Sequence, residues 1–262
     1  LIAPADTAWG PSDGPAKAAP AAPWRRVEAQ AVSAAAAALT CGERAMLMLG
    51  GAALRGKALE FAGRIAARTG CRLMAEYNNA RMECGAGRVR VDRLPYVVAN
   101  AVSELKSIRQ LVLAGAKVPV AFFAYPNKPS VLIPQDCAVS VLAGVEHDLE
   151  QALEALAAEV DALRTPVAAI PVRAPPSLPH GALTPDGIAT VLAALLPEQA
   201  VVVDESISTG RNFGAFMTGA RPHDWLNITG GSIGWGLPAA TGVAIGAPDR
   251  RVIALEGDGA AM

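Results

Sequence analysis

The feature that most constrains the fold is an alternation of short apolar runs with longer segments of helical periodicity. Residues 45–51 are apolar and end in glycines, and in the next segment apolar side chains recur near helical spacing until Gly70. Strand-like runs over 109–116 and 200–206 repeat the pattern. Because continuous apolar strands alternating with helices are typical of parallel sheets covered on both faces, the sequence predicts an α/β fold.

Two stretches rich in Pro, Ala and Gly divide the chain, and neither has a period, so we interpret both as linkers. The division gives residues 1–10, linker 11–24, a middle block over 25–163, linker 164–181 and a terminal block over 182–262. Thr184 and Pro185 predict the capped start of a helix in the terminal block. We therefore expect two doubly wound parallel-sheet domains, a complete central one and a truncated second one.

Composition excludes several classes of partner. The net charge is −1 and no basic cluster is present, which argues against nucleic acid and against an anionic membrane surface. Polar residues interrupt the apolar stretches before the ~18 to 20 residues that a membrane-spanning helix needs. The four cysteines form no CxxC pair, so we expect buried free thiols in a cytoplasmic protein, with two disulfides as the alternative.

One segment near the end of the chain combines two features that suit a phosphate ligand. Glycines at 230, 231 and 234 allow close backbone approach, and the helix expected from about Leu237 would offer free N–H groups to an anion. One strand later Asp258 lies between two glycines, where a carboxylate can hold a magnesium ion. Together they predict a diphosphate bound through a metal, although each alone is also an ordinary turn feature.

The amino-acid sequence of this segment resembles that of a known family. "GGSIGWGLPAATG" (230–242), followed by "APDRRVIALEGDG" (247–259), is similar to the cofactor domain of thiamine diphosphate enzymes of the acetolactate synthase and benzoylformate decarboxylase group. By the same resemblance, "LIAPADTAW" (1–9) is the last strand of the family's pyrimidine-binding domain, and residues 1–10 are the end of that domain. The middle block then corresponds to the family's central domain.

The resemblance implies roles for the residues around the GDG motif. Asp258 corresponds to a magnesium ligand, and Gly257 and Gly259 would line the diphosphate. Ala260 belongs to the same cofactor-binding set but departs from the family, which often has Ser there.

The remaining implied cofactor contacts lie in two other segments. Ile233 matches the bulky residue that holds the cofactor in its bent conformation, and the backbone around Gly231, beside Ser232, would accept a hydrogen bond from the aminopyrimidine. Ser206 and Ser208 match hydroxyls that approach the diphosphate.

Glu205 has two interpretations, a direct role at the cofactor or a strand-end carboxylate bonded to nearby N–H groups. The turn over 50–56 also has two, a structural turn or a nucleotide contact. Synthases that carry FAD have an Arg-rich loop where this chain has "KVPVAFFAYP" (117–126), which argues against FAD.

The three histidines share no metal-ligand spacing. His147 lies at a helix start, His180 lies in a linker, and we expect His223 in a loop near the surface.

The resemblance implies a thiamine diphosphate- and Mg²⁺-dependent carboligase or decarboxylase that acts on a 2-keto acid, most similar to acetolactate synthase, in a homodimer or homotetramer. The alternatives are a benzoylformate-type decarboxylase without ligation, or a noncatalytic nucleotide-binding α/β module. No catalytic residue is assigned, because the family's activating Glu lies in the pyrimidine-binding domain of a neighbouring subunit, and an Asn pair follows the GDG motif at a distance. We therefore expect this chain alone to be an inactive fragment.

Overall fold

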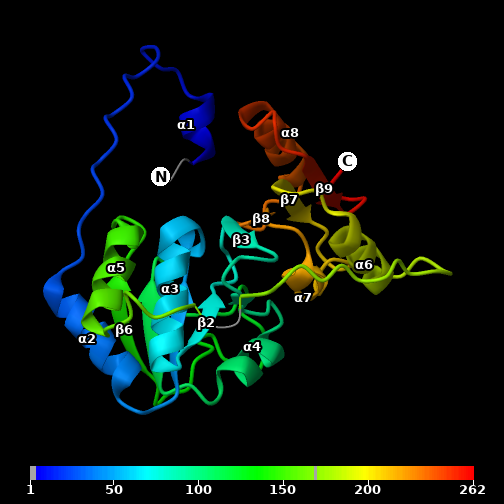
Figure 1. The fold of residues 1–262 in the computed structure, drawn as a ribbon. Helices are drawn as coiled ribbons and strands as arrows, with labels where there is room; N and C mark the ends of the chain where they lie inside the picture. The colour runs from blue at the N-terminus through cyan, green and yellow to red at the C-terminus, as the bar shows by residue number, and fades with distance from the viewer. Residues whose placement is uncertain (1–3, 168–169) are drawn as a thin grey trace.

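The central sheet is built as the apolar pattern predicts. The structure is a computed structural model that describes residues 4–167 and 170–262. Five parallel strands have the order β4-β2-β1-β5-β6 (Figure 1). They are β1 (Ala45–Leu49), β2 (Arg72–Ala75), β4 (Asp92–Arg93), β5 (Gln110–Ala114) and β6 (Ala138–Ala143).

Helices cover both faces of this sheet, as expected. On one face lie α2 (Ala29–Thr40), α3 (Gly56–Thr69) and α5 (Leu149–Glu159), and on the other lies α4 (Val98–Leu105). The 3₁₀ turn η1 (Gly51–Leu54) joins β1 to α3. Strand β1 supplies both cores because its side chains alternate, with Leu47 and Leu49 facing one way and Met46 and Met48 the other. All four are fully buried.

The second sheet has one strand that the sequence pattern did not predict. β7 (Ala200–Glu205), β8 (His223–Asn227) and β9 (Val252–Glu256) are parallel, but β3 (Arg81–Cys84) pairs antiparallel with β8. The sheet order is β3-β8-β7-β9. Since β3 comes from the middle block, the two blocks share a sheet, and the predicted domain boundaries stay a prediction.

The first helix of the second sheet has the expected cap. α6 (Pro185–Leu195) begins at Pro185, and the Thr184 hydroxyl accepts a hydrogen bond from Gly187 N at 3.0 Å, which confirms the predicted cap. α7 (Phe213–Phe216) and η2 (Met217–Gly219) pack near α6. α8 (Gly236–Gly246) packs on β7 and β9.

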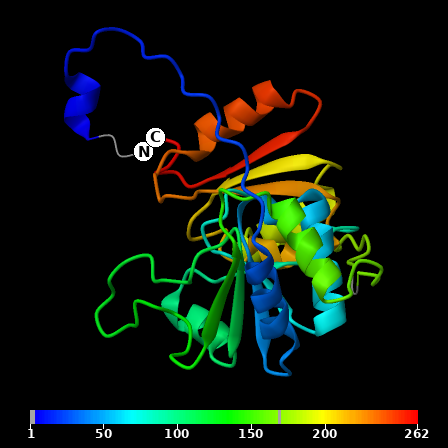
Figure 2. The ribbon, with the colours of Figure 1, turned by 90° about the vertical axis from the view of Figure 1, so that its left-hand side faces the viewer.

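The amino-terminal prediction is wrong in part. Residues 1–3 lie outside the described residues, but the strand expected over 1–9 is replaced by the short helix α1 (Ala5–Trp9). Both views show α1 apart from the sheets, at the end of a long extended segment (Figures 1 and 2). The linker over 164–181 has no helix or strand among its described residues, and its residues 168–169 lie outside them.

All four cysteines are free thiols, but the expectation that they are buried holds only for Cys71. Cys41 is exposed, because it comes directly after the last turn of α2, and Cys84 and Cys137 are partly buried. Among the described residues, each helix is too short or too polar to cross a membrane.

Candidate functional site

The loops at the carboxyl ends of β7 and β9 line an open cavity of about 440 Å³. These two strands are parallel neighbours, so the loops after them emerge at the same edge of the sheet, where α/β proteins bind ligands. The loop before α8 adds one side chain. The cavity is lined by Ser206, Ile207, Ser208, Thr209, Ile233, Glu256, Gly257, Asp258, Gly259 and Ala260.

Seven of the nine residues that the sequence suggested for the cofactor or metal lie in this cavity wall. The other two, Gly231 and Ser232, are exposed on the same loop as Ile233 but are not among the lining residues. The structure thus brings three separate segments to one place. Their roles in binding stay a prediction.

The turn after β9 presents Asp258 at the surface of the cavity. Gly259 N donates to Asp258 Oδ1 at 2.9 Å, and Ala260 N donates to Gly257 O at 3.1 Å, which closes the turn. A Cβ atom at Gly259 would have no atom within 4 Å, so this position is open. The Asp258 carboxylate keeps one oxygen without a hydrogen-bond partner in the described chain and is free to face a ligand.

Hydrogen bonds to the Asp204 side chain fix the start of the loop after β7. Its Oδ1 accepts from Ser206 N at 3.0 Å and from Ser206 Oγ at 2.5 Å, and its Oδ2 accepts from Trp225 Nε1 at 3.2 Å. Ile207, the next residue, has φ of 44°, a left-handed conformation that a β-branched residue rarely adopts. Such strain is common at ligand sites, where surrounding bonds hold the loop in place.

Sequence reasoning missed three residues of the cavity wall. Ile207 and Thr209 lie in the same "SIST" run as the two predicted serines, and the run of hydroxyls was a usable signal for Thr209. Glu256 directly precedes the GDG motif, but no pattern distinguished it from a strand-end residue.

Glu205 is bonded to backbone N–H groups, as one of its two interpretations proposed. Its side chain is 1% exposed and accepts from Gly234 N at 2.7 Å and from Gly236 N at 2.5 Å. A carboxylate at a helix N-terminus is stabilised by the orphan donors and the dipole. The expectation that the N–H groups at the start of α8 are free for a ligand anion is therefore wrong for Gly236, because the chain's own carboxylate accepts from it.

Glu256 lies beside Glu205, because the two residues are paired in the β7–β9 register. Both of its carboxylate oxygens are buried and have no hydrogen-bond partner within the described chain. Burial, together with the smaller effect of the negative charges of Glu205 and Asp204, raises the pKa of Glu256. A Cβ atom at position 236 would collide with this carboxylate, so Gly236 is required for the close approach of α8.

The donor set suits a magnesium ion held mainly by phosphate oxygens. Residues 4–167 and 170–262 contain no group of three His, Cys, Asp or Glu side chains placed to hold a metal. Mg²⁺ commonly binds through one or two carboxylates together with substrate phosphates, so the single carboxylate of Asp258 is compatible with it. The hydroxyl of Ser208 adds a donor for a phosphate oxygen, whereas the single hydroxyl proton of Ser206 is donated to Asp204.

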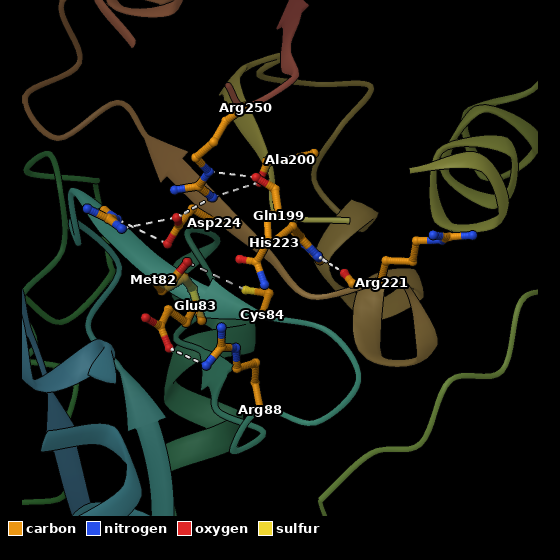
Figure 3. Close-up of polar contacts among 11 residues, drawn as sticks. Met82, Glu83, Cys84, Arg88, Gln199, Ala200, Arg221, His223, Asp224 and Arg250 are labelled. Atoms are coloured by element: carbon orange, nitrogen blue, oxygen red, sulfur yellow. Dashed lines mark hydrogen bonds and ion pairs between the residues drawn. The ribbon is translucent and has the colours of Figure 1, made fainter. Parts of the chain in front are cut away.

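A second polar cluster joins β3 to β8 (Figure 3). It lies away from the cavity, since Asp224 is paired with Val201 near the start of β7, whereas the cavity lies beyond the end of that strand. Asp224 accepts from Arg81 Nε and Nη2, both at 3.0 Å, and pairs with Arg250 at 2.6 Å. Burial alone would raise the pKa of Asp224, but the two arginines outweigh it and the pKa is lowered. Arg250 also donates to the carbonyls of Gln199 and Ala200.

His223 belongs to this cluster and not to a surface loop, so its predicted position is wrong. It lies in β8, paired with Cys84 of β3, and is 2% exposed. Its Nδ1 is 2.7 Å from Arg221 O, and its Nε2 has no partner among the residues described. Burial lowers the pKa of this imidazole.

Known proteins with similar sequences or folds support the family resemblance. Residues 209–262 match the family described as "Thiamine pyrophosphate enzyme, C-terminal TPP binding domain". The whole chain is 46% identical to a Mycobacterium tuberculosis protein named "Putative acetolactate synthase large subunit IlvX" and covers 50% of it. A benzoylformate decarboxylase of Pseudomonas aeruginosa is 37% identical over 44% of the chain and 22% of its own length.

A solved structure shows the same fold. The thiamine diphosphate-dependent 4-hydroxybenzoylformate decarboxylase of Rhodococcus jostii RHA1 superposes on 98% of this chain with a TM-score of 0.70, at 22% identity, and the match covers 50% of that protein. This chain thus spans about half the length of these full-length relatives. By these similarities the chain resembles the thiamine diphosphate-dependent enzymes of the acetolactate synthase and benzoylformate decarboxylase family, and residues 209–262 match that family's C-terminal TPP binding domain.

Proposed function

We propose that this chain serves a thiamine diphosphate- and Mg²⁺-dependent enzyme that acts on a 2-keto acid as a carboligase, in the manner of acetolactate synthase. The observation that carries the proposal is the convergence of the β7 loop, Ile233 and the GDG turn on one cavity. The similarity of the whole chain to a relative named as a putative acetolactate synthase large subunit supports carboligation as the reaction. We further propose a cytoplasmic location and a homodimer or homotetramer.

Different residues of the cavity would contact different parts of the cofactor. Asp258 would bind Mg²⁺ and Ser208 would donate to a diphosphate oxygen, whereas Ser206 could donate only by giving up its hydrogen bond to Asp204. The backbone of Gly257 and Gly259 would let the diphosphate approach closely. Ile233, which is largely exposed in the cavity wall, offers an apolar surface to the cofactor's rings. When bound, the thiazolium ring supplies an electron sink for the loss of carbon dioxide from the 2-keto acid.

Glu205 acts indirectly in this scheme. By bonding Gly234 N and Gly236 N it fixes the loop that carries Ile233 against the end of β7. The loop is therefore set before the cofactor arrives, which lowers the ordering cost of binding.

Decarboxylation without ligation is the second candidate. It is favoured by the similarity to benzoylformate decarboxylase over 44% of the chain. The two reactions differ in the fate of the intermediate after carbon dioxide leaves, so product analysis separates them. With pyruvate, a ligase yields a five-carbon hydroxy-keto acid, whereas a simple decarboxylase yields acetaldehyde.

The test uses the full product of the gene that encodes this chain. Thiamine diphosphate is titrated calorimetrically with and without Mg²⁺, and products from pyruvate and phenylglyoxylate are identified by NMR. We expect Mg²⁺-dependent binding, and Asp258→Asn should weaken it at least about tenfold, since one charged ligand is lost. Asp249→Asn, an exposed carboxylate in the turn between α8 and β9, is the matched control.

Two results would contradict the proposal. Cofactor binding that is unaffected by both Mg²⁺ and Asp258→Asn would remove the metal site. Absence of turnover with both 2-keto acids, despite bound cofactor, would favour a noncatalytic module.

A further inference from the structure

The loop that carries Ile233 connects two elements of the second sheet, but residues of the middle block hold it in place. The loop consists of residues 228–235, between β8 and α8. Ile233 lies in the wall of the cavity. Glu205 bonds the end of the loop and the start of α8, through Gly234 N and Gly236 N. The start and the middle of the loop have other supports, and both come from the middle block.

The start of the loop is held through the side chain of Asn227, the last residue of β8. Asn227 Oδ1 accepts a hydrogen bond from Arg93 of β4, and Asn227 Nδ2 donates to Asn79 Oδ1 at 3.1 Å. Asn79 in turn donates to Glu76 O at 2.9 Å, directly after β2. Asn227 and Asn79 are 3% and 1% exposed. Because buried amides are costly to leave unpaired, these bonds fix the position at which the chain leaves β8.

The middle of the loop is held by an aromatic ring. Gly231 has φ of 68°, and a Cβ atom there would lie 2.9 Å from Phe122 Cζ, so the ring of Phe122 packs against the Gly231 backbone. Phe122 belongs to the connection between β5 and β6. Its ring centre lies 5.8 Å from that of Tyr96, which lies 5.1 Å from that of Tyr77. Ring pairs at these separations are favourable, so Phe122 is itself supported.

The two supports are parts of one cluster. The Arg93 guanidinium, which bonds Asn227, also lies 5.5 Å from the centre of the Tyr77 ring. Tyr77 follows β2, and Arg93 ends β4, which pairs in parallel with the end of β2. The cluster therefore lies at the carboxyl edge of the central sheet and contacts the second block at both Asn227 and Gly231. We call Tyr77, Asn79, Arg93, Tyr96 and Phe122 the support cluster.

These contacts matter for the cavity because Ile233 contributes little to its own position. Its side chain is 65% exposed, so the backbone on either side of it decides where it lies. Gly231 is held by Phe122 on one side, and Gly234 is held by Glu205 on the other. A wall that is ordered before a ligand arrives binds that ligand at a lower entropic cost. Without the support cluster, the ligand itself would have to order the loop.

We propose that Asn227 and Phe122 are positioning residues for the cofactor, and that the middle block thereby sets how tightly the second sheet binds it. This inference rests on the proposed function and deepens it, because it gives the middle block a part in cofactor binding. Asn227 and Phe122 are not among the residues that line the cavity. Both act through the backbone of residues 228–233.

Thiamine diphosphate is titrated calorimetrically into the full gene product, with Mg²⁺ present, to test the proposal. Asn227→Ala removes both amide bonds at the start of the loop and should raise Kd by about tenfold, since binding must then order the loop. Phe122→Ala leaves space beside Gly231 and should raise Kd by about fivefold. Phe122→Leu keeps an apolar side chain against Gly231 and should restore most of the affinity.

Two control variants separate positioning from a general loss of stability. Phe123→Ala removes the neighbouring ring, which is 58% exposed, and Asp224→Ala removes a buried side chain from the same strand as Asn227. Both should leave Kd within about twofold of the wild type, because Asp224 bonds Arg81 and Arg250 and the Phe123 ring packs beside Tyr125. Asp224→Ala should nevertheless lower the melting temperature at least as far as Asn227→Ala. All titrations are run below the lowest melting temperature.

A measurement without cofactor distinguishes failure of this inference from failure of the proposed function. The δ1-methyl NMR signal of Ile233, assigned through its absence from Ile233→Val, reports the order of the loop in the cofactor-free protein. It should be a single sharp signal in the wild type and in both control variants. It should broaden or split in Asn227→Ala and Phe122→Ala, because a released loop exchanges between conformations.

The possible results have different consequences. If the Ile233 signal changes in Asn227→Ala and Phe122→Ala but the wild type binds no thiamine diphosphate, the proposed function fails and the ordering of the loop by the middle block stands. In a protein that does bind the cofactor, an unchanged Kd or an unchanged Ile233 signal in these two variants overturns the inference. An equal rise of Kd in Asp224→Ala overturns it as well.

Discussion

The two sheets differ in the loops at the carboxyl ends of their parallel strands. In the central sheet, Gly50 N donates to Ala114 O at 3.0 Å, and a side chain at either Gly50 or Gly115 would collide with the backbone of the other. The Glu76 carboxylate lies against Gly50 and accepts from Lys117 N. In the second sheet, the ends of β7 and β9 open into the cavity of about 440 Å³.

The difference shows that a glycine-rich turn after a parallel strand has two uses. At Gly50 the missing side chain lets two backbone segments touch, which supports the structural interpretation of the turn over 50–56. At Gly259 the missing side chain leaves open space beside a carboxylate. The same residue type therefore closes one edge and keeps the other accessible. That no flavin binds the central sheet stays a prediction.

The sheets also differ at their other edges. The central sheet takes all its strands from the middle block, whereas the second sheet depends on β3 from that block. The hydrogen bonds of Asp224 with Arg81 and its ion pair with Arg250 stabilise the pairing of β3 with the second sheet.

The largest effect is expected from Asp224→Ala. The change leaves two guanidinium groups without their buried partner, and the loss of a buried ion pair typically costs about 3 to 5 kcal/mol. The Arg81 side chain is 41% exposed and regains water, so the lower end, about 3 kcal/mol, is expected. Urea unfolding measures it. A change below about 0.5 kcal/mol would mean that β3 does not fasten the second sheet.

Gly115→Ala should come next and tests the closed edge. Gly115 has φ of 67°, and its new Cβ would meet Gly50 O and the Leu149 side chain. Strain and overpacking together should cost about 2 to 3 kcal/mol of unfolding free energy. Equal stability of this variant and the wild type would show that the central edge is as open as the second one.

A smaller effect should appear as a pH dependence of the unfolding free energy, caused by His223 where β8 pairs with β3. Burial lowers the pKa of His223 below its ordinary 6.5, so between the two values the unfolded chain binds more protons than the folded chain. Stability should therefore fall as the pH drops below about 6.5, by at most about 1.4 kcal/mol per pH unit.

The control for this dependence is His223→Gln, which cannot titrate. Unfolding free energies of the two proteins are compared from about pH 5 to about pH 8, and their difference isolates the imidazole from carboxylates that titrate at lower pH. Parallel curves for the two proteins would contradict the burial of a neutral His223.

The smallest effect on stability is expected from Gly259→Ala. No atom lies within 4 Å of the new Cβ, so the unfolding free energy should change by less than about 0.5 kcal/mol. The methyl group would enter the cavity, however, and should weaken cofactor binding in the same calorimetric titration. A large loss of stability would show that this edge is packed as tightly as the one at Gly115.

Much of the fold could be predicted from local pattern. The apolar runs at β1, β5 and β7 are fully or nearly continuous, and strands buried on both faces require that pattern. The cap of α6 was predictable because Thr184 and Pro185 act on adjacent backbone groups. β3 was not predicted, because "RMEC" alternates polar and apolar residues over only four positions and its partner, β8, lies about 140 residues further along the chain.

The candidate site divides in the same way. The sequence by itself determined which segments meet at the cavity, since "SIS", "GGSIG" and "EGDG" combine hydroxyls, glycines and a carboxylate at strand ends. Only the tertiary structure decided that Glu205 accepts from the Gly236 amide at the start of α8 and that Phe122 packs on Gly231. These contacts join residues from different elements, and the sequence pattern of one element carries no information on which distant side chain will meet it.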